Sequence, residues 1–362
     1  MTSARNPMRP LRGRAGTLPC GRAANDRETP AVSRRSLRVP PPLLLLLLHC
    51  ALVIPGIAAE AAGSHPLMTD DLGDTLLAGP YPQKIVSLSP SITEMLFAIG
   101  VDSARIAGVT SYCDYPPAAT RRPRVGGIVD PSMERLQMIR PDLVLATRGN
   151  PVSTLSQIRA LGIPVFATDD RASLEGIGSI MTRLALLLGP EDQARTDSCL
   201  AAFHRLHSRY RAWSDSIPQD RRPRVLLVDP QNPDWSAGPG SHVDALIRLA
   251  GGRNVIEGGP SWPRISSEFV LSRDPDLLLV AAPPGQGRDE ISAQLLARPG
   301  WRVLRALRHE EGAVEPPAAG LCLIDTATLL RPGPRMFGAL IEMAECFHPG
   351  ATPATSGGAG GR

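Results

Sequence analysis

Four aromatic side chains occupy short segments that follow apolar runs of the sequence. Tyr112 and Tyr115 come just before a Pro-Pro pair, and Trp235 and Trp262 have proline and glycine neighbours. Because proline and glycine favour turns, we expect these rings in loops. Aromatic faces in a loop can stack on a flat ligand, which is the chemistry of binding. Packing inside a core is the alternative for each ring.

The sequence lacks the common signatures of catalysis. It contains no Gly-x-Ser-x-Gly nucleophile turn, no Gly-x-Gly-x-x-Gly dinucleotide loop, no His-Glu-x-x-His metal helix and no Walker phosphate loop. His204 and His207 lie three residues apart, and His242 follows a Gly-Pro-Gly turn, but no further ligand accompanies them at a suitable spacing. We therefore expect no enzyme and no metal site, with an exported α/β enzyme as the alternative.

Short apolar runs alternate with helical patterns from residue 83 onwards. Ser91 and Glu94 form the pattern of a capping box, which predicts a helix that starts at Ser91 and ends near Gly100. Strands are expected at 85–89, 105–110, 143–146 and 165–167, and further helices at 131–139, 153–161 and up to residue 189. Alternation of this kind favours a parallel sheet built from βα units.

Residues 190–216 have no strand signal. Leu200, Phe203 and Tyr210 are spaced for one face of a single helix of about 25 residues, which would span roughly 38 Å. Strand signals then resume at 224–229, 277–280 and 321–324, and Ser241 caps a helix that runs to residue 249. The fold class expected is α/β, with two Rossmann-like lobes of mainly parallel sheet joined by one long α-helix.

A short pattern occurs once in each half of the chain. Ser132-Met133-Glu134 and Ser266-Ser267-Glu268 each precede a Pro-Asp-Leu segment and an apolar strand, with the glutamate seven residues before the proline. We interpret this as one helix-strand unit present in each lobe. A carboxylate in the first turn of a helix is favourable without any partner, because it faces the positive end of the helix dipole.

The N-terminal region has the features of an export signal. Residues 1–42 carry nine Arg against one Asp and one Glu, so the rest of the chain has a net charge of −3, which argues against nucleic-acid binding. A six-leucine run at 43–48 is followed by small residues before Ala61. Of the cysteines beyond residue 61, none has metal-ligand spacing, and no disulfide is predicted: Cys113, Cys199, Cys322 and Cys346.

These patterns divide the chain into six parts. The expected parts are a leader and export signal at 1–61, a flexible segment at 62–82, an N-terminal lobe at 83–189, a linker helix at 190–221, a C-terminal lobe at 222–349 and a disordered tail at 350–362.

Three segments carry a resemblance to a known family. Residues 84–94 and 140–146 resemble the helix-linked (class III) substrate-binding proteins of ABC importers, among them the periplasmic vitamin B12 (corrinoid)-binding proteins. The most specific segment is Ser111-Tyr112-Cys113-Asp114-Tyr115-Pro116-Pro117. The resemblance implies a periplasmic, non-catalytic protein, monomeric when free. It would hold cobalamin or a related corrinoid between two lobes, need no further cofactor, and dock on a membrane permease that a separate ATPase drives.

The resemblance also assigns residues. Ligand contacts fall on Pro90, Tyr112, Tyr115, Arg148, Trp235, Trp262 and Arg331, and permease-docking carboxylates fall on Glu134 and Glu268. The match has gaps, because two family tryptophans become Ile128 and Thr147, and an acidic contact becomes Ala327. A precursor such as cobinamide, haem or a ferric siderophore therefore stays open as the ligand.

Overall fold

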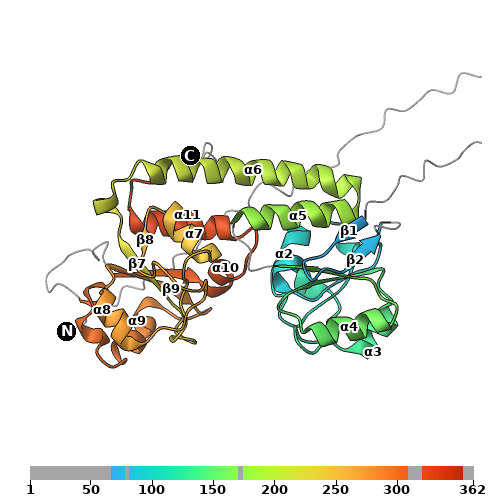
Figure 1. The fold of residues 1–362 in the computed structure, drawn as a ribbon, viewed down its shortest axis with the longest axis horizontal. Coiled ribbons are helices and arrows are strands. Elements are labelled where there is room, and N and C mark those ends of the chain that lie inside the picture. Colours follow the sequence, from blue (N-terminus) through green and yellow to red (C-terminus); the bar gives the residue numbers. More distant parts are fainter. Residues whose placement is uncertain (1–66, 78–80, 170–173, 309–319, 354–362) are drawn as a thin grey trace, which may run out of the picture.

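The computed structural model describes residues 67–77, 81–169, 174–308 and 320–353, so the expected leader lies outside the described residues. The described chain forms two α/β lobes that share one long helix (Figure 1). None of its helices has the length and apolar character of a membrane span.

The N-terminal lobe is built on a parallel sheet of four strands. Their order is β4-β3-β5-β6, and the residues of β3 and β5 are buried throughout. The strands are β3 (Ile85–Ser87), β4 (Ile106–Val109), β5 (Leu143–Thr147) and β6 (Val165–Thr168), and the helices are α2 (Pro90–Ala98), α3 (Met133–Ile139), α4 (Val152–Ala160) and α5 (Leu174–Leu188). Runs buried on both faces are typical of parallel sheets.

The C-terminal lobe repeats this topology. Its parallel sheet has the order β10-β9-β7-β8, so in both sheets the first strand of the lobe lies between the second and the third. The strands are β7 (Arg224–Val228), β8 (Arg253–Asn254), β9 (Leu277–Ala282) and β10 (Gly320–Asp325), and the helices are α7 (His242–Leu249), α8 (Ser267–Arg273), α9 (Arg288–Leu296), α10 (Thr326–Leu330) and α11 (Met336–Phe347). The predicted fold class is confirmed.

A single helix, α6 (Pro190–Asp215), runs across both lobes (Figure 1). Its 26 residues correspond to about 39 Å of helix. Phe203 of α6 stacks on Phe337 of α11, with ring centroids 4.6 Å apart, and the helix also packs on α5 and α7. One apolar core continues through α5, α6, α7 and α11, so the connection between the lobes is a packed joint.

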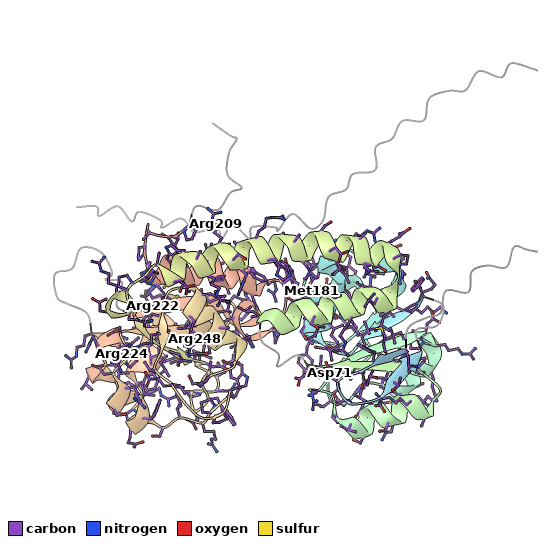
Figure 2. All side chains as sticks on the ribbon, turned by 45° about the horizontal axis from the view of Figure 1, so that its top comes forward. Asp71, Met181, Arg209, Arg222, Arg224 and Arg248 are labelled. Atoms are coloured by element: carbon purple, nitrogen blue, oxygen red, sulfur yellow. The ribbon has the colours of Figure 1, made fainter. Side chains whose placement is uncertain are left out.

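The segment expected to be flexible contains an ordered hairpin. β1 (Leu67–Thr69) pairs with β2 (Thr75–Leu77), and Asp71 of the connecting turn donates its backbone N–H to the carbonyl of Ala167 at the end of β6. The Asp71 carboxylate lies 2.7 Å from the guanidinium of Arg183, and Figure 2 places Asp71 on the N-terminal lobe. The expectation of flexibility for residues 67–77 was wrong because the polar turn docks on the lobe.

The capping box was also wrong. α2 begins at Pro90, with Ser89 at the N-cap position and no side-chain cap. Proline suits the first helical position because its fixed φ is helical and no N–H is needed there. Glu94 is therefore free to point elsewhere, as described below.

The repeated helix-strand unit is confirmed. Ser132 and Ser266 each cap a seven-residue helix, and their hydroxyls accept the backbone N–H of Arg135 and Phe269 at 3.2 Å. Both helices end in a residue with left-handed backbone, with φ of 49° at Arg140 and 39° at Asp274. These turns lead directly into β5 and β9.

The beginning of the expected tail is attached to the fold. Gly350 donates its backbone N–H to Glu345 of α11, and the carbonyl of Ala351 accepts the indole N–H of Trp213 from α6 at 2.9 Å. Residues 354–362 lie outside the described residues.

Candidate functional site

The predicted ligand-contact residues all follow carboxyl ends of strands in the two sheets. This is the edge at which open α/β sheets bind ligands. Pro90 follows β3, Tyr112 and Tyr115 follow β4, Arg148 follows β5, Trp235 follows β7, Trp262 follows β8, and Arg331 follows β10 and α10.

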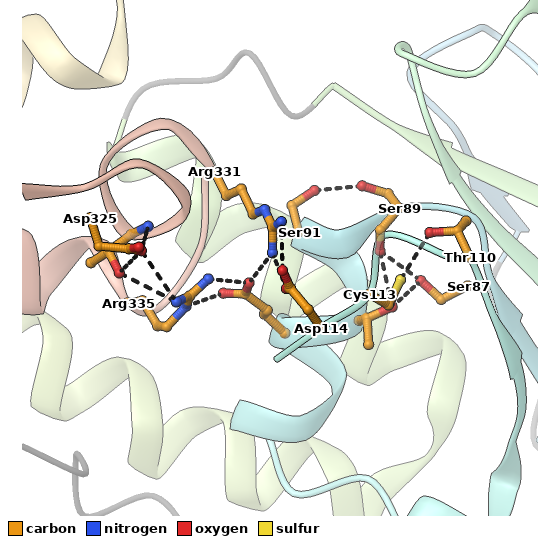
Figure 3. Close-up of polar contacts among 12 residues, drawn as sticks. Ser87, Ser89, Ser91, Thr110, Cys113, Asp114, Asp325, Arg331 and Arg335 are labelled. Carbon is orange, nitrogen blue, oxygen red and sulfur yellow. Dashed lines mark hydrogen bonds and ion pairs between the residues drawn. The ribbon is translucent and has the colours of Figure 1, made fainter. Parts of the chain in front are cut away.

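The tyrosine loop of the N-terminal lobe is exposed at its rings and anchored between them. Tyr112 is 59% exposed and Tyr115 is 37% exposed. Cys113 between them is buried, and its thiol lies 3.1 Å from the hydroxyls of both Thr93 and Thr110 (Figure 3). A buried anchor with two exposed neighbours presents aromatic faces on a fixed loop.

Two other predicted contacts are less available. Pro90 is buried in the first turn of α2. Arg148 is ion-paired to Asp169 at 2.9 Å and donates to the carbonyl of Asp71 at 2.7 Å. Arg148 is therefore already tied to the N-terminal hairpin.

The structure brings the two tryptophan loops of the C-terminal lobe together. Ser236 donates its backbone N–H to the carbonyl of Pro263 at 3.1 Å, so the residues next to Trp235 and Trp262 are hydrogen-bonded. Trp235 is 47% exposed, with the guanidinium of Arg264 6.0 Å from its ring centroid. Neither indole lies wholly in the core, which distinguishes them from the fully buried Trp301.

His242 connects Trp262 to α10. The imidazole is buried 5.6 Å from the indole, and its Nε2 lies 3.2 Å from the carbonyl of Leu329. Burial lowers the pKa of His242 to about 4, so the ring is neutral at pH 7 and Nε2 donates. Among the described residues, no group of three His, Cys, Asp or Glu could hold a metal ion.

Arginines of the C-terminal lobe meet carboxylates of the N-terminal lobe two residues beyond Leu329. Arg331 is ion-paired to Asp114 and lies 3.4 Å from Glu94. Arg335 donates to both oxygens of Glu94, at 2.8 and 2.6 Å. We call Glu94, Asp114, Arg331 and Arg335 the inter-lobe cluster (Figure 3).

The inter-lobe cluster balances two positive against two negative charges. Glu94 is nearly buried, with 3% of its side chain exposed, so its two arginines compensate the cost of removing the carboxylate from water. The hydrogen bond from Arg331 lowers the pKa of Asp114, which therefore stays ionised at neutral pH. The guanidinium of Arg335 also lies 4.2 Å from the ring centroid of Tyr115, so the cluster adjoins the tyrosine loop.

Sequence reasoning found Arg331 but missed its partners. Glu94 was interpreted as a cap, and neither Asp114 nor Arg335 was considered a site residue. One available signal was that Glu94 shares an otherwise apolar helix with Ile92, Met95 and Leu96, where a charge needs a partner.

The two predicted docking glutamates occupy equivalent exposed positions. Glu134 lies in the first turn of α3 and Glu268 in the first turn of α8, on the side of each lobe away from α6 (Figure 1). A hydrogen bond from the hydroxyl of Ser266 lowers the pKa of Glu268, so this carboxylate is ionised. A surface hollow of about 510 Å³ lies beside Glu134.

Comparisons with known proteins agree with this architecture. The chain is 26% identical over 297 residues to a cobalamin-binding protein of Halobacterium salinarum, covering 80% of this chain and 76% of that one. It is 32% identical over 205 residues to the vitamin B12-binding protein of Salmonella paratyphi A, covering 56% and 74%. The solved periplasmic heme-binding protein RhuT of Roseiflexus sp. RS-1, in apo form, superposes with a TM-score of 0.62 at 29% identity, covering 75% and 99%.

The family model described as periplasmic binding protein matches residues 85–312, which include both sheets except β10 and the whole linker helix. The match covers more than half of the chain, and the relatives named above are themselves binding proteins. With its two parallel-sheet lobes and single helical connection, this chain belongs to the periplasmic binding protein family.

Proposed function

We propose that this protein captures cobalamin or a related corrinoid between its two lobes and delivers it to the membrane permease of an ABC importer. In this proposal it is exported to the periplasm by its N-terminal leader, acts as a monomer and catalyses no reaction. The tyrosine loop and the two tryptophan loops would contact opposite faces or edges of the ligand.

The observation that carries the choice of ligand is the charge balance of the predicted contacts. Arg331 is paired with Asp114 and Glu94, and Arg148 is paired with Asp169. A corrinoid has a largely amide-bearing, neutral edge, and it suits a site that offers aromatic faces and compensated charges. An anionic ligand would have to displace a carboxylate partner before it could use either arginine.

Two similar proteins support the same ligand class. They are the cobalamin-binding protein of Halobacterium salinarum and the vitamin B12-binding protein of Salmonella paratyphi A. The aromatic loops are the features of this chain that a flat macrocycle could use in the same way.

Haem is the second candidate, and one observation favours it. The phenol of Tyr112 is 59% exposed at the carboxyl edge of the N-terminal sheet, and tyrosine is an established ligand of haem iron. The similarity to the heme-binding protein RhuT points the same way. A ferric siderophore is a weaker form of this alternative, because its anionic charge meets the same paired arginines.

A ligand titration separates these candidates. We expect cyanocobalamin or cobinamide to quench the tryptophan fluorescence of the purified protein, with a dissociation constant in about the nanomolar to micromolar range. Equilibrium dialysis with the same ligands checks binding without relying on fluorescence. Hemin and a ferric siderophore serve as competitors. Saturable binding of hemin with no binding of either corrinoid would overturn the proposed ligand.

A further inference from the structure

Two cysteines of the C-terminal lobe lie side by side. Cys322 is buried in β10, and Cys346 is half-buried in the last turn of α11, which packs against β10. Their thiols hydrogen-bond to each other. Cys113, in contrast, uses its thiol to contact the hydroxyls of Thr93 and Thr110.

We propose that Cys322 and Cys346 form a dithiol that closes to a disulfide when it meets a disulfide oxidant of the oxidised-glutathione type. The two thiols lose two protons and two electrons and form one S–S bond. The oxidant takes up both electrons and both protons, and its own S–S bond is cleaved to two thiols. The proposed periplasmic location supplies such oxidants, so the in vivo part of this inference rests on the proposed function.

The environment of the two thiols sets the order of attack. Cys346 is the more accessible, and the hydrogen bond from Cys322 lowers its pKa. The hydrogen bond to Cys346, together with burial, raises the pKa of Cys322. Because the thiolate is the nucleophile in disulfide exchange, Cys346 attacks the oxidant first and forms a mixed disulfide. Cys322 then attacks the sulfur of Cys346 and releases the second half of the oxidant.

The disulfide would close a loop that carries half of the inter-lobe cluster. Residues 322–346 include Arg331 and Arg335, together with Asp325, which lies 3.9 Å from Arg335. A bond between the start and the end of this segment limits how far it can move away from the sheet. Oxidation therefore fastens the arm that holds Glu94 of the other lobe.

The test uses the purified full chain, first reduced and then exposed to oxidised glutathione. We expect non-reducing peptide mapping by mass spectrometry to show a Cys322–Cys346 cross-linked peptide, lighter by two hydrogens than the two thiol peptides together. Reduction should then lower the melting temperature by roughly 5–10 °C. A Cys346→Ser variant should form no cross-link, and its melting temperature should not respond to oxidant.

A Cys113→Ser variant is the matched control, since serine can keep the hydrogen bonds to Thr93 and Thr110 while Cys322 and Cys346 stay intact. It should retain the cross-link. A mixed glutathione disulfide that persists at Cys346, or a cross-link that joins a different pair, would overturn the inference. The reaction in vitro does not depend on export or on any ligand, so its failure is distinct from failure of the proposed function. A corrinoid titration of Cys346→Ser reads that function separately.

Discussion

Arg335 of the C-terminal lobe holds Glu94 of the N-terminal lobe by two hydrogen bonds, of 2.8 and 2.6 Å, across 241 residues of sequence. The pair lies where α11 begins and inside α2, and it is almost shielded from water. Two lobes that share only one connecting helix are thereby joined at a second point.

Replacement of Arg335 by alanine should destabilise the protein and loosen the lobes. The buried Glu94 carboxylate would keep only the longer contact with Arg331, and an incompletely paired buried charge is costly. We expect a loss of about 3 kcal/mol in the free energy of unfolding. Urea unfolding measures this loss, and small-angle X-ray scattering should show a larger radius of gyration.

The matched control for Arg335→Ala is Arg248→Ala. Arg248 pairs with Asp244 four residues earlier on α7, so this ion pair lies within one lobe. Its removal should cost less than about 1 kcal/mol and leave the radius of gyration unchanged. Equal effects of the two substitutions would show that the inter-lobe cluster has no special role in joining the lobes.

Local patterns explain why the fold was predictable. Buried strands such as 143–147 read as continuous apolar runs, and the long polar-faced helix after Gly189 has no strand signal, so the two lobes and the linker could be inferred. The hairpin at 67–77 could not, because its attachment depends on Asp71 reaching Ala167, which is remote in sequence.

The candidate site was predictable only in part. The loops with Tyr112, Trp235 and Trp262 were identifiable because turn residues follow strands. The partners of Arg331 were not, because a buried ion pair between lobes leaves no periodic pattern in either segment. Sequence spacing gives the edge of a sheet at which a residue lies, but it does not give the charges that face it across a domain interface.

The exposed indole of Trp235 should contribute to ligand binding by stacking. We expect Trp235→Ala to weaken corrinoid binding about three- to tenfold, because aromatic contacts are worth about 0.5–1.5 kcal/mol each. Equilibrium dialysis measures this. Tyr81→Ala is the control, because Tyr81 is similarly exposed but precedes β3, at the opposite edge of the sheet. A ligand affinity that Trp235→Ala leaves unchanged would remove this indole from the site.

The buried imidazole of His242 should make stability depend on pH. In the unfolded chain its pKa is near 6.5, but in the folded protein burial lowers it to about 4. Between these values the unfolded state binds a proton that the folded state does not, so stability falls as the pH falls. The loss should reach about 3 kcal/mol between pH 7 and pH 4, measured by urea unfolding at each pH.

His242→Gln isolates this effect from the titration of carboxylates. Glutamine keeps an N–H donor for the carbonyl of Leu329 but cannot take up a proton in this range. The difference in unfolding free energy between the wild type and the variant should therefore change with pH below about 6.5. Parallel curves for the two proteins would contradict a neutral, buried His242.

The paired positions of Glu134 and Glu268 predict that both lobes are needed for delivery to the permease. Each carboxylate is exposed in the first turn of an equivalent helix, where arginines of a partner could reach it and form bidentate pairs. Replacement of both by arginine should abolish corrinoid uptake by whole cells while the purified protein keeps its ligand affinity. Glu290→Arg is the control, because Glu290 is also exposed in a first helical turn, on α9. Since a permease must contact both lobes to separate them, each single reversal should impair uptake only in part. Uptake that survives the double reversal would exclude these glutamates as docking residues.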